Sequence, residues 1–280
     1  MSKWRPSPDS GLYVIPDIHG EWGLLQNVLK RILPLRKNKQ IEDRVVLLGN
    51  FIGRSNKSLT LLKELIKIKE KYPDRFTFVL GENEWRFREV LLNPSAKTYI
   101  EWIEKGGGLS MLSSYIEENE IPVSHPMEID HYRLQSLVPE EHKRFIFSLV
   151  PFAEIDNYIF VHKGCDPLSP LQDQNVSSLV LDQGLWELAY ETTETFTQKT
   201  VVMGGHKVGP WISPSVIMLD GSSQNRLPVM ELNSFSVYEA RKGQNRMVKL
   251  DARVPKGSGY KLISGFNKRF GKNKDKILDI

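Results

Sequence analysis

Six polar residues that are far apart in the chain stand at or just after the ends of apolar, strand-like segments. They comprise two carboxylates, three imidazoles and one amide: Asp17, His19, Asn50, Glu82, His162 and His206. Imidazoles combined with carboxylates suit divalent metals of the Mn, Fe, Co or Zn class better than Mg or Ca, which prefer all-oxygen sites. A single histidine is usually structural, so the prediction of a metal site depends on their joint placement.

The segments that precede these residues have the composition of short β-strands. The first three are each followed by residues with helical periodicity, such as Leu24, Leu25 and Val28 after the first. Three consecutive strand–turn–helix units predict a layered α/β fold. The expected strands cover residues 12–15, 45–48, 76–80, 158–161, 201–203, 216–219, 229–232 and 236–238.

The place of the polar residues relative to these strands indicates where the site should be. The carboxyl ends of parallel strands share one edge of a sheet, and open α/β sheets bind ligands in the crevice at that edge. We therefore expect the six residues to converge there and to bind divalent metal.

Residues 95–150 differ from their surroundings, because they contain helical patterns without strands. Examples are residues 99–104, residues 111–118 after a triple glycine, and the segment that opens with Pro139. We interpret this region as a helical insertion in a domain that covers residues 1–240.

The positive charge is concentrated near the end of the sequence. Residues 241–280 contain 12 Lys and Arg against 3 Asp and Glu, which leaves 26 against 31 in the remainder. This segment is rich in Gly, Lys and Asn, a composition typical of a flexible tail. Such a basic tail can stay solvated, or it can bind an anionic partner such as nucleic acid or an acidic protein.

Other features of the sequence bear on the compartment. The single cysteine, Cys165, cannot form an intramolecular disulfide. No segment approaches the roughly 20 apolar residues that cross a bilayer, and the polar start of the chain lacks the apolar core of a signal peptide. We expect a cytoplasmic protein without a membrane span.

Five short motifs resemble, in order, those of the phosphoprotein phosphatase branch of the calcineurin-like metallophosphoesterases, especially its bacterial serine/threonine phosphatase-like members. The family motifs GDxHG, GDxVDRG, GNHE, HAG or HGG, and GHT correspond to PDIHG, GNFIGRS, GENE, HKG and GHK. These stand at residues 16–20, 49–55, 81–84, 162–164 and 205–207. Residues 107–115 also resemble a GG-x-x-TL-x-SY signature of bacterial members. The resemblance covers about residues 11–240 and implies a β-sandwich flanked by helices.

The resemblance also implies roles for individual residues. Asp17 and His19 would hold one metal ion, positions 82, 162 and 206 a second, and position 50 would bridge them. In the family the two ions activate the water that attacks phosphorus, and Arg54 would bind the phosphate oxygens as a planar fork. The catalytic positions are then His19, Arg54 and Asn83, and the substrate is a phosphorylated molecule.

Two departures from the family concern the metal ligands. The bridging Asp is replaced by Asn50, whose single neutral carbonyl oxygen bridges two cations poorly, and the Asn ligand is replaced by Glu82. We expect a tightened second site and a weakened first one.

Two further departures concern proton donation. The catalytic His of the family is Asn83 here, and the Asp that orients it is Gly53. General acid catalysis contributes about 10² to 10⁴ in rate, so the suitable substrates are those whose leaving group needs no proton, such as aryl phosphates and phosphoanhydrides.

Two lysines follow the histidines of the last two motifs. We hypothesise that Lys163 and Lys207 contact phosphate; the alternative is that both extend into solvent, as lysines mostly do.

Two functions are therefore consistent with the sequence. The expected one is a metal-dependent phosphoric ester hydrolase that cleaves phosphate esters or anhydrides with a remodelled metal centre. The alternative is a silenced pseudophosphatase that binds metal and a phosphorylated ligand or partner. The retained Asp17 and histidines favour metal binding, whereas Asn50, Gly53 and Asn83 favour a loss of rate.

Overall fold

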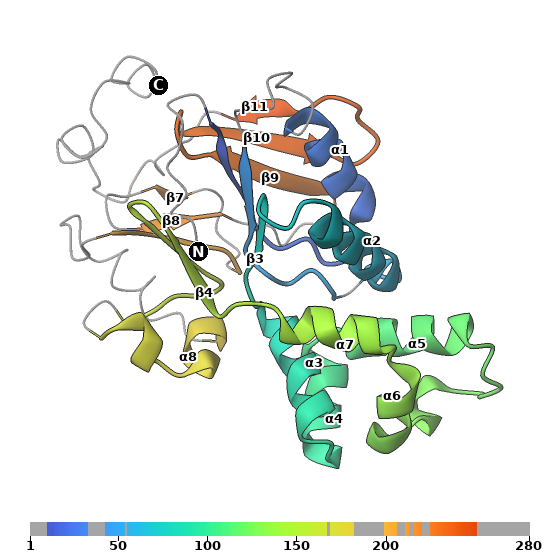
Figure 1. The fold of residues 1–280 in the computed structure, drawn as a ribbon. Helices are drawn as coiled ribbons and strands as arrows, with labels where there is room; N and C mark the ends of the chain where they lie inside the picture. Colours follow the sequence, from blue (N-terminus) through green and yellow to red (C-terminus); the bar gives the residue numbers. More distant parts are fainter. Residues whose placement is uncertain are drawn as a thin grey trace, which may run out of the picture.

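Two β-sheets lie face to face, and helices cover the outer side of each (Figure 1). The computed structural model describes residues 10–32, 43–53, 55–166, 169–181, 199–205, 211–212, 216–219 and 225–250. Three residues predicted to take part in the site, Arg54, His206 and Lys207, lie outside these ranges, as do residues 251–280 of the predicted tail.

The first sheet has six strands in the order β11-β10-β9-β1-β2-β3. Strands β1 (Leu12–Ile15), β2 (Arg44–Leu47) and β3 (Phe76–Phe78) are parallel to one another. Strands β9 (Arg226–Glu231), β10 (Ser236–Arg241) and β11 (Val248–Leu250) extend the sheet in antiparallel fashion. Residues 241–250, the first part of the predicted tail, thus include the end of β10 and the whole of β11.

The second sheet has five strands in the order β4-β5-β6-β8-β7. Its centre is the parallel set β5 (Tyr158–Val161), β6 (Thr200–Met203) and β8 (Val216–Met218). Strands β4 (Phe152–Ile155) and β7 (Trp211–Ile212) pair antiparallel at its two edges.

Side chains alternate between the two faces of each strand and thereby form separate core layers. Val14 and Val46 face the second sheet and pack in one cluster with Phe160 and Val202. Their neighbours along the same strands face the opposite way and pack against helices α1 (Trp22–Ile32) and α2 (Ser58–Lys71). The outer face of the second sheet packs on α8 (Val176–Leu181), which follows the short helix η2 (Leu171–Asp173). This arrangement confirms the predicted layered α/β sandwich.

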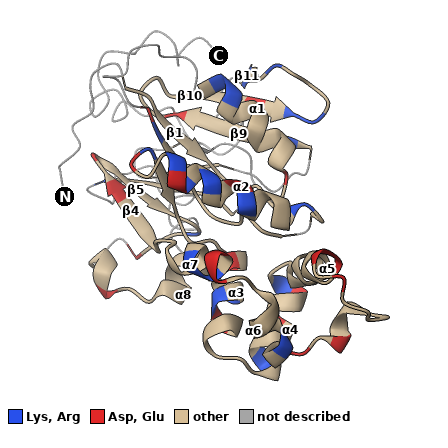
Figure 2. Cartoon of the chain, turned by 45° about the vertical axis from the view of Figure 1, so that its right-hand side comes forward, with Lys and Arg blue, Asp and Glu red and all other residues tan. Residues whose placement is uncertain are grey.

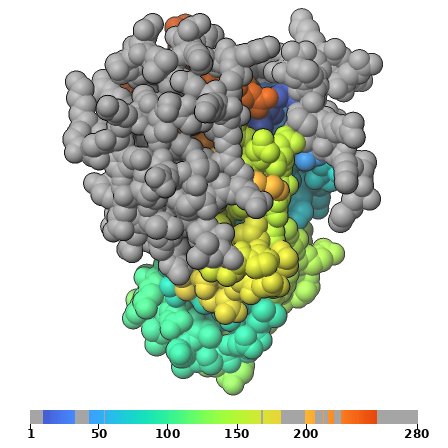
Figure 3. Space-filling view, turned by 90° about the vertical axis from the view of Figure 1, so that its left-hand side faces the viewer, coloured from blue at the N-terminus to red at the C-terminus, as the bar shows by residue number. Residues whose placement is uncertain are grey.

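The predicted helical insertion is also present. Helix α3 (Glu82–Leu92) leads into α4 (Ala96–Lys105), α5 (Gly108–Glu118), η1 (Pro126–Glu128), α6 (His131–Leu137) and α7 (Glu140–Phe147). These helices extend from one end of the sandwich (Figure 1), and α3 and α8 lie against each other where the insertion meets the body (Figure 3).

The surface of the described helices carries charges of both signs. Along α2, lysines at 63, 67, 69 and 71 are interspersed with Glu64 and Glu70 (Figure 2). Within the part of the chain that the structure describes, no helix combines the length and the apolar character needed to cross a membrane.

Candidate metal centre

The loops that follow β1 and β2 hold each other in place through their backbones. The amides of Ile18 and His19 donate to the carbonyl of Asn50, at 3.1 and 2.8 Å, and the amide of Gly20 donates to Phe51 at 2.7 Å. His19 and Asn50 both have left-handed backbones, with φ of 49° and 50°. Few residue types other than glycine adopt this conformation, and Asn and His are among those that do so most often.

Glycines allow the loop after β3 to join the other two. A Cβ on Gly49, where φ is +94°, would lie 2.4 Å from the Cα of Gly81. The two backbones therefore touch, and any side chain at position 49 would separate them. This contact places the loops after all three parallel strands of the first sheet at one edge, as the sequence predicts.

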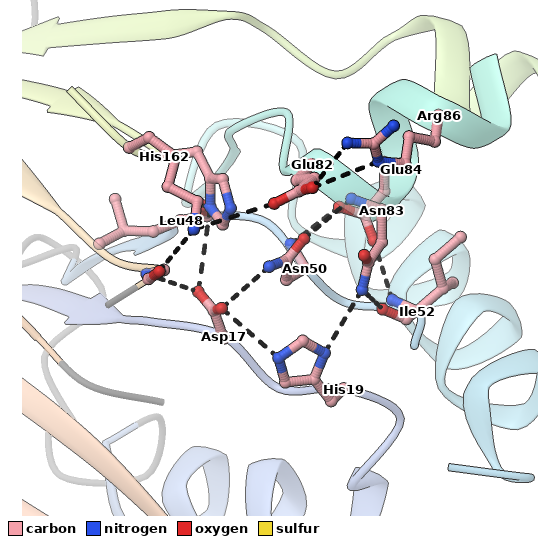
Figure 4. Close-up of polar contacts among 12 residues, drawn as sticks. Asp17, His19, Leu48, Asn50, Ile52, Glu82, Asn83, Glu84, Arg86 and His162 are labelled. Atoms are coloured by element: carbon pink, nitrogen blue, oxygen red, sulfur yellow. Dashed lines mark hydrogen bonds and ion pairs between the residues drawn. The ribbon is translucent and has the colours of Figure 1, made fainter. Parts of the chain in front are cut away.

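Asp17 lies at the centre of this edge, surrounded by groups that stabilise its ionised form (Figure 4). Its Oδ1 accepts from the Gly205 amide at 3.0 Å, and its Oδ2 accepts from the Asn50 side-chain nitrogen at 2.9 Å. The Nε2 of His19 is 3.5 Å from Oδ2. Burial opposes ionisation of Asp17, but His162, His19 and Asn50 outweigh it, and the net effect holds the pKa of this carboxyl well below its usual value.

His162 is oriented by the backbone of the neighbouring sheet. Its Nδ1 lies 2.7 Å from the carbonyl oxygen of Leu48, which can only accept, so Nδ1 carries the proton. Burial is the main cause that lowers the pKa of His162 and keeps the ring neutral. Its Nε2 is buried and has no hydrogen-bond partner among the described residues. A neutral imidazole with one nitrogen fixed by a carbonyl and the other left as a lone pair is the arrangement typical of a metal ligand.

Asn50 presents its amide nitrogen, rather than its oxygen, to Asp17. The side-chain oxygen of Asn50 accepts from the backbone amide of Asn83 at 2.9 Å, while its nitrogen donates to Asp17. Rotating the amide by half a turn would lose both bonds and set two oxygens against each other. In this orientation the oxygen of Asn50, the atom that could bind a cation, is engaged by the Asn83 amide.

Glu82 is engaged by the cationic side chains of Arg86 and Lys163. Its Oε1 accepts from Arg86 at 2.9 Å (Nη2) and 3.2 Å (Nε), and its Oε2 lies 3.8 Å from the Nζ of Lys163. The same Nζ donates to the Gly205 carbonyl at 2.6 Å. Lys163 is only 7% exposed, so the alternative that it extends into solvent is wrong.

Asn83 and Gly53, which stand where the family has its acid pair, are in close contact. The Asn83 side-chain nitrogen donates to the Ile52 carbonyl at 2.8 Å and lies 3.4 Å from the Nδ1 of His19. A Cβ on Gly53 would lie 2.6 Å from that same Nδ1. A side chain at position 53 would therefore displace His19.

Glu84 is a buried residue beside the centre whose part in the site we did not predict from the sequence. Its two carboxylate oxygens accept the backbone amides of Asn50 and Ile52, both at 2.8 Å, and it is fully buried. Burial raises the pKa of this carboxyl to about 7, although the backbone amides partly offset the effect. Glu84 supports the loop that carries Asn50. The signal that could have identified it is the last letter of the GENE motif.

The fold is similar to that of solved phosphatases. One neighbour is described as a "putative diadenosine tetraphosphatase", with 15% identity and a TM-score of 0.57 over 85% of this chain and 96% of that one. Another is a cold-active protein-tyrosine phosphatase of a psychrophile, Shewanella sp., with 14% identity and a TM-score of 0.50 over 86% and 80%. The chain shares the layered fold of these solved structures. The sequence itself matches no family model and no curated protein.

Some of the described residues have the chemistry of metal ligands, and others are engaged by protein groups. The buried, unpartnered Nε2 of His162 fits a metal, and so do Asp17 and His19, whose donor atoms face each other. The amide nitrogen of Asn50 and the paired carboxylate of Glu82 do not. Among the residues that the structure describes, no group of three or more His, Cys, Asp or Glu is arranged to hold a metal by itself.

Proposed function

We propose that this protein is a phosphoesterase-like protein that binds a phosphorylated molecule beside a divalent ion and hydrolyses esters or anhydrides with good leaving groups. The observation that carries the proposal is the state of His162, whose Nδ1 is held by Leu48 and whose buried Nε2 is left without a partner. Burying an unpaired nitrogen costs free energy, and a metal ligand is the role that makes use of it.

Different residues of the chain would bind the ion and the phosphate. Asp17, His19 and His162, together with His206 by its place in the motif, would hold the ion, which supplies positive charge to a phosphoryl oxygen when bound. Arg54 would bind the remaining phosphate oxygens by virtue of its planar guanidinium. Metals of the Mn, Fe, Co or Zn class suit these ligands.

The proposed substrate class follows from the residues beside His19. The Asn83 amide, which donates to the Ile52 carbonyl, is not an acid and cannot protonate an alkoxide. We infer that aryl phosphates and phosphoanhydrides are cleaved, whereas alkyl phosphates of serine type are poor substrates.

A silenced pseudophosphatase is the second candidate, and the orientation of Asn50 favours it. An amide nitrogen that donates to Asp17 satisfies the carboxylate without any metal. Such a protein would bind a phosphorylated ligand or partner and release it unchanged.

Hydrolysis of an aryl phosphate, an alkyl phosphate and a dinucleoside polyphosphate, each with Mn²⁺ or Co²⁺, separates the two candidates. The proposal predicts turnover of the first and third by the natural chain and its loss in Asp17→Asn, which controls for a contaminating phosphatase. A variant with Asn50→Asp, Glu82→Asn and Asn83→His restores the family's residue types at three of the four positions that depart from it, and it keeps Gly53 because a side chain there would displace His19. Turnover by this variant alone would establish the silenced scaffold instead.

A further inference from the structure

Lys163 places a positive charge inside the candidate metal centre. Its side chain is 9% exposed, and its ammonium group donates to the Gly205 carbonyl and lies 3.8 Å from the Oε2 of Glu82. Gly205 also donates its amide to Asp17. The ammonium is therefore attached to the same short segment that contacts the central carboxylate.

Because Gly205 has no side chain, the side chain of Lys163 can pack against it. A Cβ at this position would lie 3.0 Å from both Cδ and Cε of Lys163 and 3.1 Å from the Nε2 of His162. The stem of the lysine and the unpartnered nitrogen of the histidine thus border the same small volume. Position 205 has φ of +71°, a conformation that glycine adopts without strain.

The charges of the centre are balanced by the chain itself. Glu82 is paired with Arg86 on one oxygen and faces Lys163 with the other, while Asp17 accepts from Asn50 and Gly205. A buried carboxylate requires a cation or several hydrogen-bond donors. Asp17 has the donors, and the partly exposed Glu82 has two cations beside it. No excess negative charge remains among these groups to attract two divalent ions.

We propose that Lys163 is a built-in cation that takes the place of a second divalent ion, so that the centre holds at most one metal ion. The proposal rests on the metal binding put forward in the proposed function, and it reverses the sequence-based expectation that Glu82 tightens the second metal site. Glu82 is the counter-ion of Lys163 and Arg86. Compared with the family motifs, the sequence has a carboxylate in place of the Asn at position 82 and also has a lysine at position 163. A second ion, beside Glu82, would be repelled by the ammonium at short range.

Calorimetric titration with Mn²⁺ and with Zn²⁺ tests the proposal without any measurement of activity. We expect the natural chain to bind no more than one ion, and Lys163→Met to bind an additional ion or the same ion at least about tenfold more tightly. Lys143→Met is the matched control, because Lys143 pairs with Glu140 on α7 and its loss changes the net charge equally. Its metal binding should equal that of the natural chain.

Two results would overturn the proposal: two tightly bound ions in the natural chain, or unchanged metal binding in Lys163→Met. If Lys163→Met does not fold, Lys163→Gln and the stoichiometry of the natural chain still decide the matter. Failure of the proposed function is a separate outcome. If substitution of Lys163 adds an ion but the chain hydrolyses nothing, the built-in cation is supported and the hydrolase is contradicted. If the natural chain turns substrate over with two bound ions, the hydrolase is supported and the built-in cation is contradicted.

Discussion

Asn50 and Asp17 form the contact on which the chemistry of the centre most depends. An Asp at position 50 has the same shape and tolerates the same left-handed backbone, so the backbone does not explain why Asn is present. The difference is the hydrogen bond, because Asn50 donates to a carboxylate that an Asp would repel. The residue type thus decides whether the centre is stable without metal.

We predict that Asn50→Asp destabilises the metal-free protein by about 2–4 kcal/mol, since a charge-assisted hydrogen bond becomes a contact between two buried carboxylates. Added Mn²⁺ should recover most of the loss by neutralising both. Thermal unfolding with a chelator and with excess Mn²⁺ measures the two effects.

The matched control is Asn56→Asp, the same change at an exposed position, which should alter stability by no more than about 0.5 kcal/mol. If Asn50→Asp is as stable as the natural chain in the presence of the chelator, the assigned orientation of the Asn50 amide is wrong.

At the scale of elements, the insertion is attached to the centre by glycine backbones. Gly107, which precedes α5, has φ of +68°, and a Cβ there would lie 2.5 Å from the Cα and 2.8 Å from the carbonyl oxygen of Gly53. The start of α5 therefore rests directly on the loop that borders His19.

We predict that Gly107→Ala destabilises the protein by about 2–4 kcal/mol, because a left-handed alanine is strained and its Cβ collides with backbone that cannot move aside. Chemical denaturation measures the change. Gly23→Ala is the control: nothing lies within 4 Å of a Cβ at this position in α1, so alanine should stabilise the helix by about 0.4–1 kcal/mol. Equal effects of the two substitutions would contradict the contact with Gly53.

The elements that the sequence predicted are those with a strong period or an apolar run. The strand at 12–15 has the predicted bounds, and the helices that follow β1, β2 and β3 are present. Strands β4, β7 and β11 were not predicted. They are edge strands of two to four residues, and pairing with a neighbour, rather than their own pattern, makes them strands.

The candidate site shows a similar division. The positions of these residues after strands predicted that they gather at the edge of the first sheet. The structure brings Asp17, His19, Asn50, Glu82 and His162 together there. Their hydrogen-bond partners could not be predicted from the sequence, because hydrogen bonds such as the one from Asn50 to Asp17 depend on side-chain orientation. The pairing of Glu82 with Arg86 is a contact across one helical turn that the motif comparison passed over. The metal-ligand roles themselves stay predictions.

At the scale of the whole molecule, helices α5 and α7 of the insertion both pack against α2 of the body, and a buried histidine connects α7 to α5. His142 on α7 is fully buried, and the hydroxyl of Tyr115 on α5 lies 3.0 Å from its Nδ1. Burial is the main cause that lowers the pKa of His142; Lys63 on α2 adds to it, while Glu141 and Glu118 oppose it. The neutral ring is therefore part of the contact between α5 and α7.

The contribution of His142 to the unfolding free energy should consequently fall in mild acid. A lowered pKa in the folded state means that the unfolded chain binds the proton more readily, so the contribution of His142 is complete above about pH 6.5 and is lost as the pH falls. Glu84 acts in the opposite sense, because its pKa is raised to about 7 and its contribution is lost as the pH rises through that value. The natural chain shows the sum of the two.

Comparison with His142→Asn isolates the histidine. We predict that the natural chain loses up to about 1.4 kcal/mol for each pH unit below 6.5 relative to this variant, measured by urea unfolding between about pH 5 and about pH 7.5. His125→Asn, a change at an exposed histidine, should follow the natural chain throughout. If the unfolding free energies of His142→Asn and the natural chain change in parallel with pH, His142 is not the group that titrates. The slope with pH would then have the opposite sign, and Glu84 would account for it.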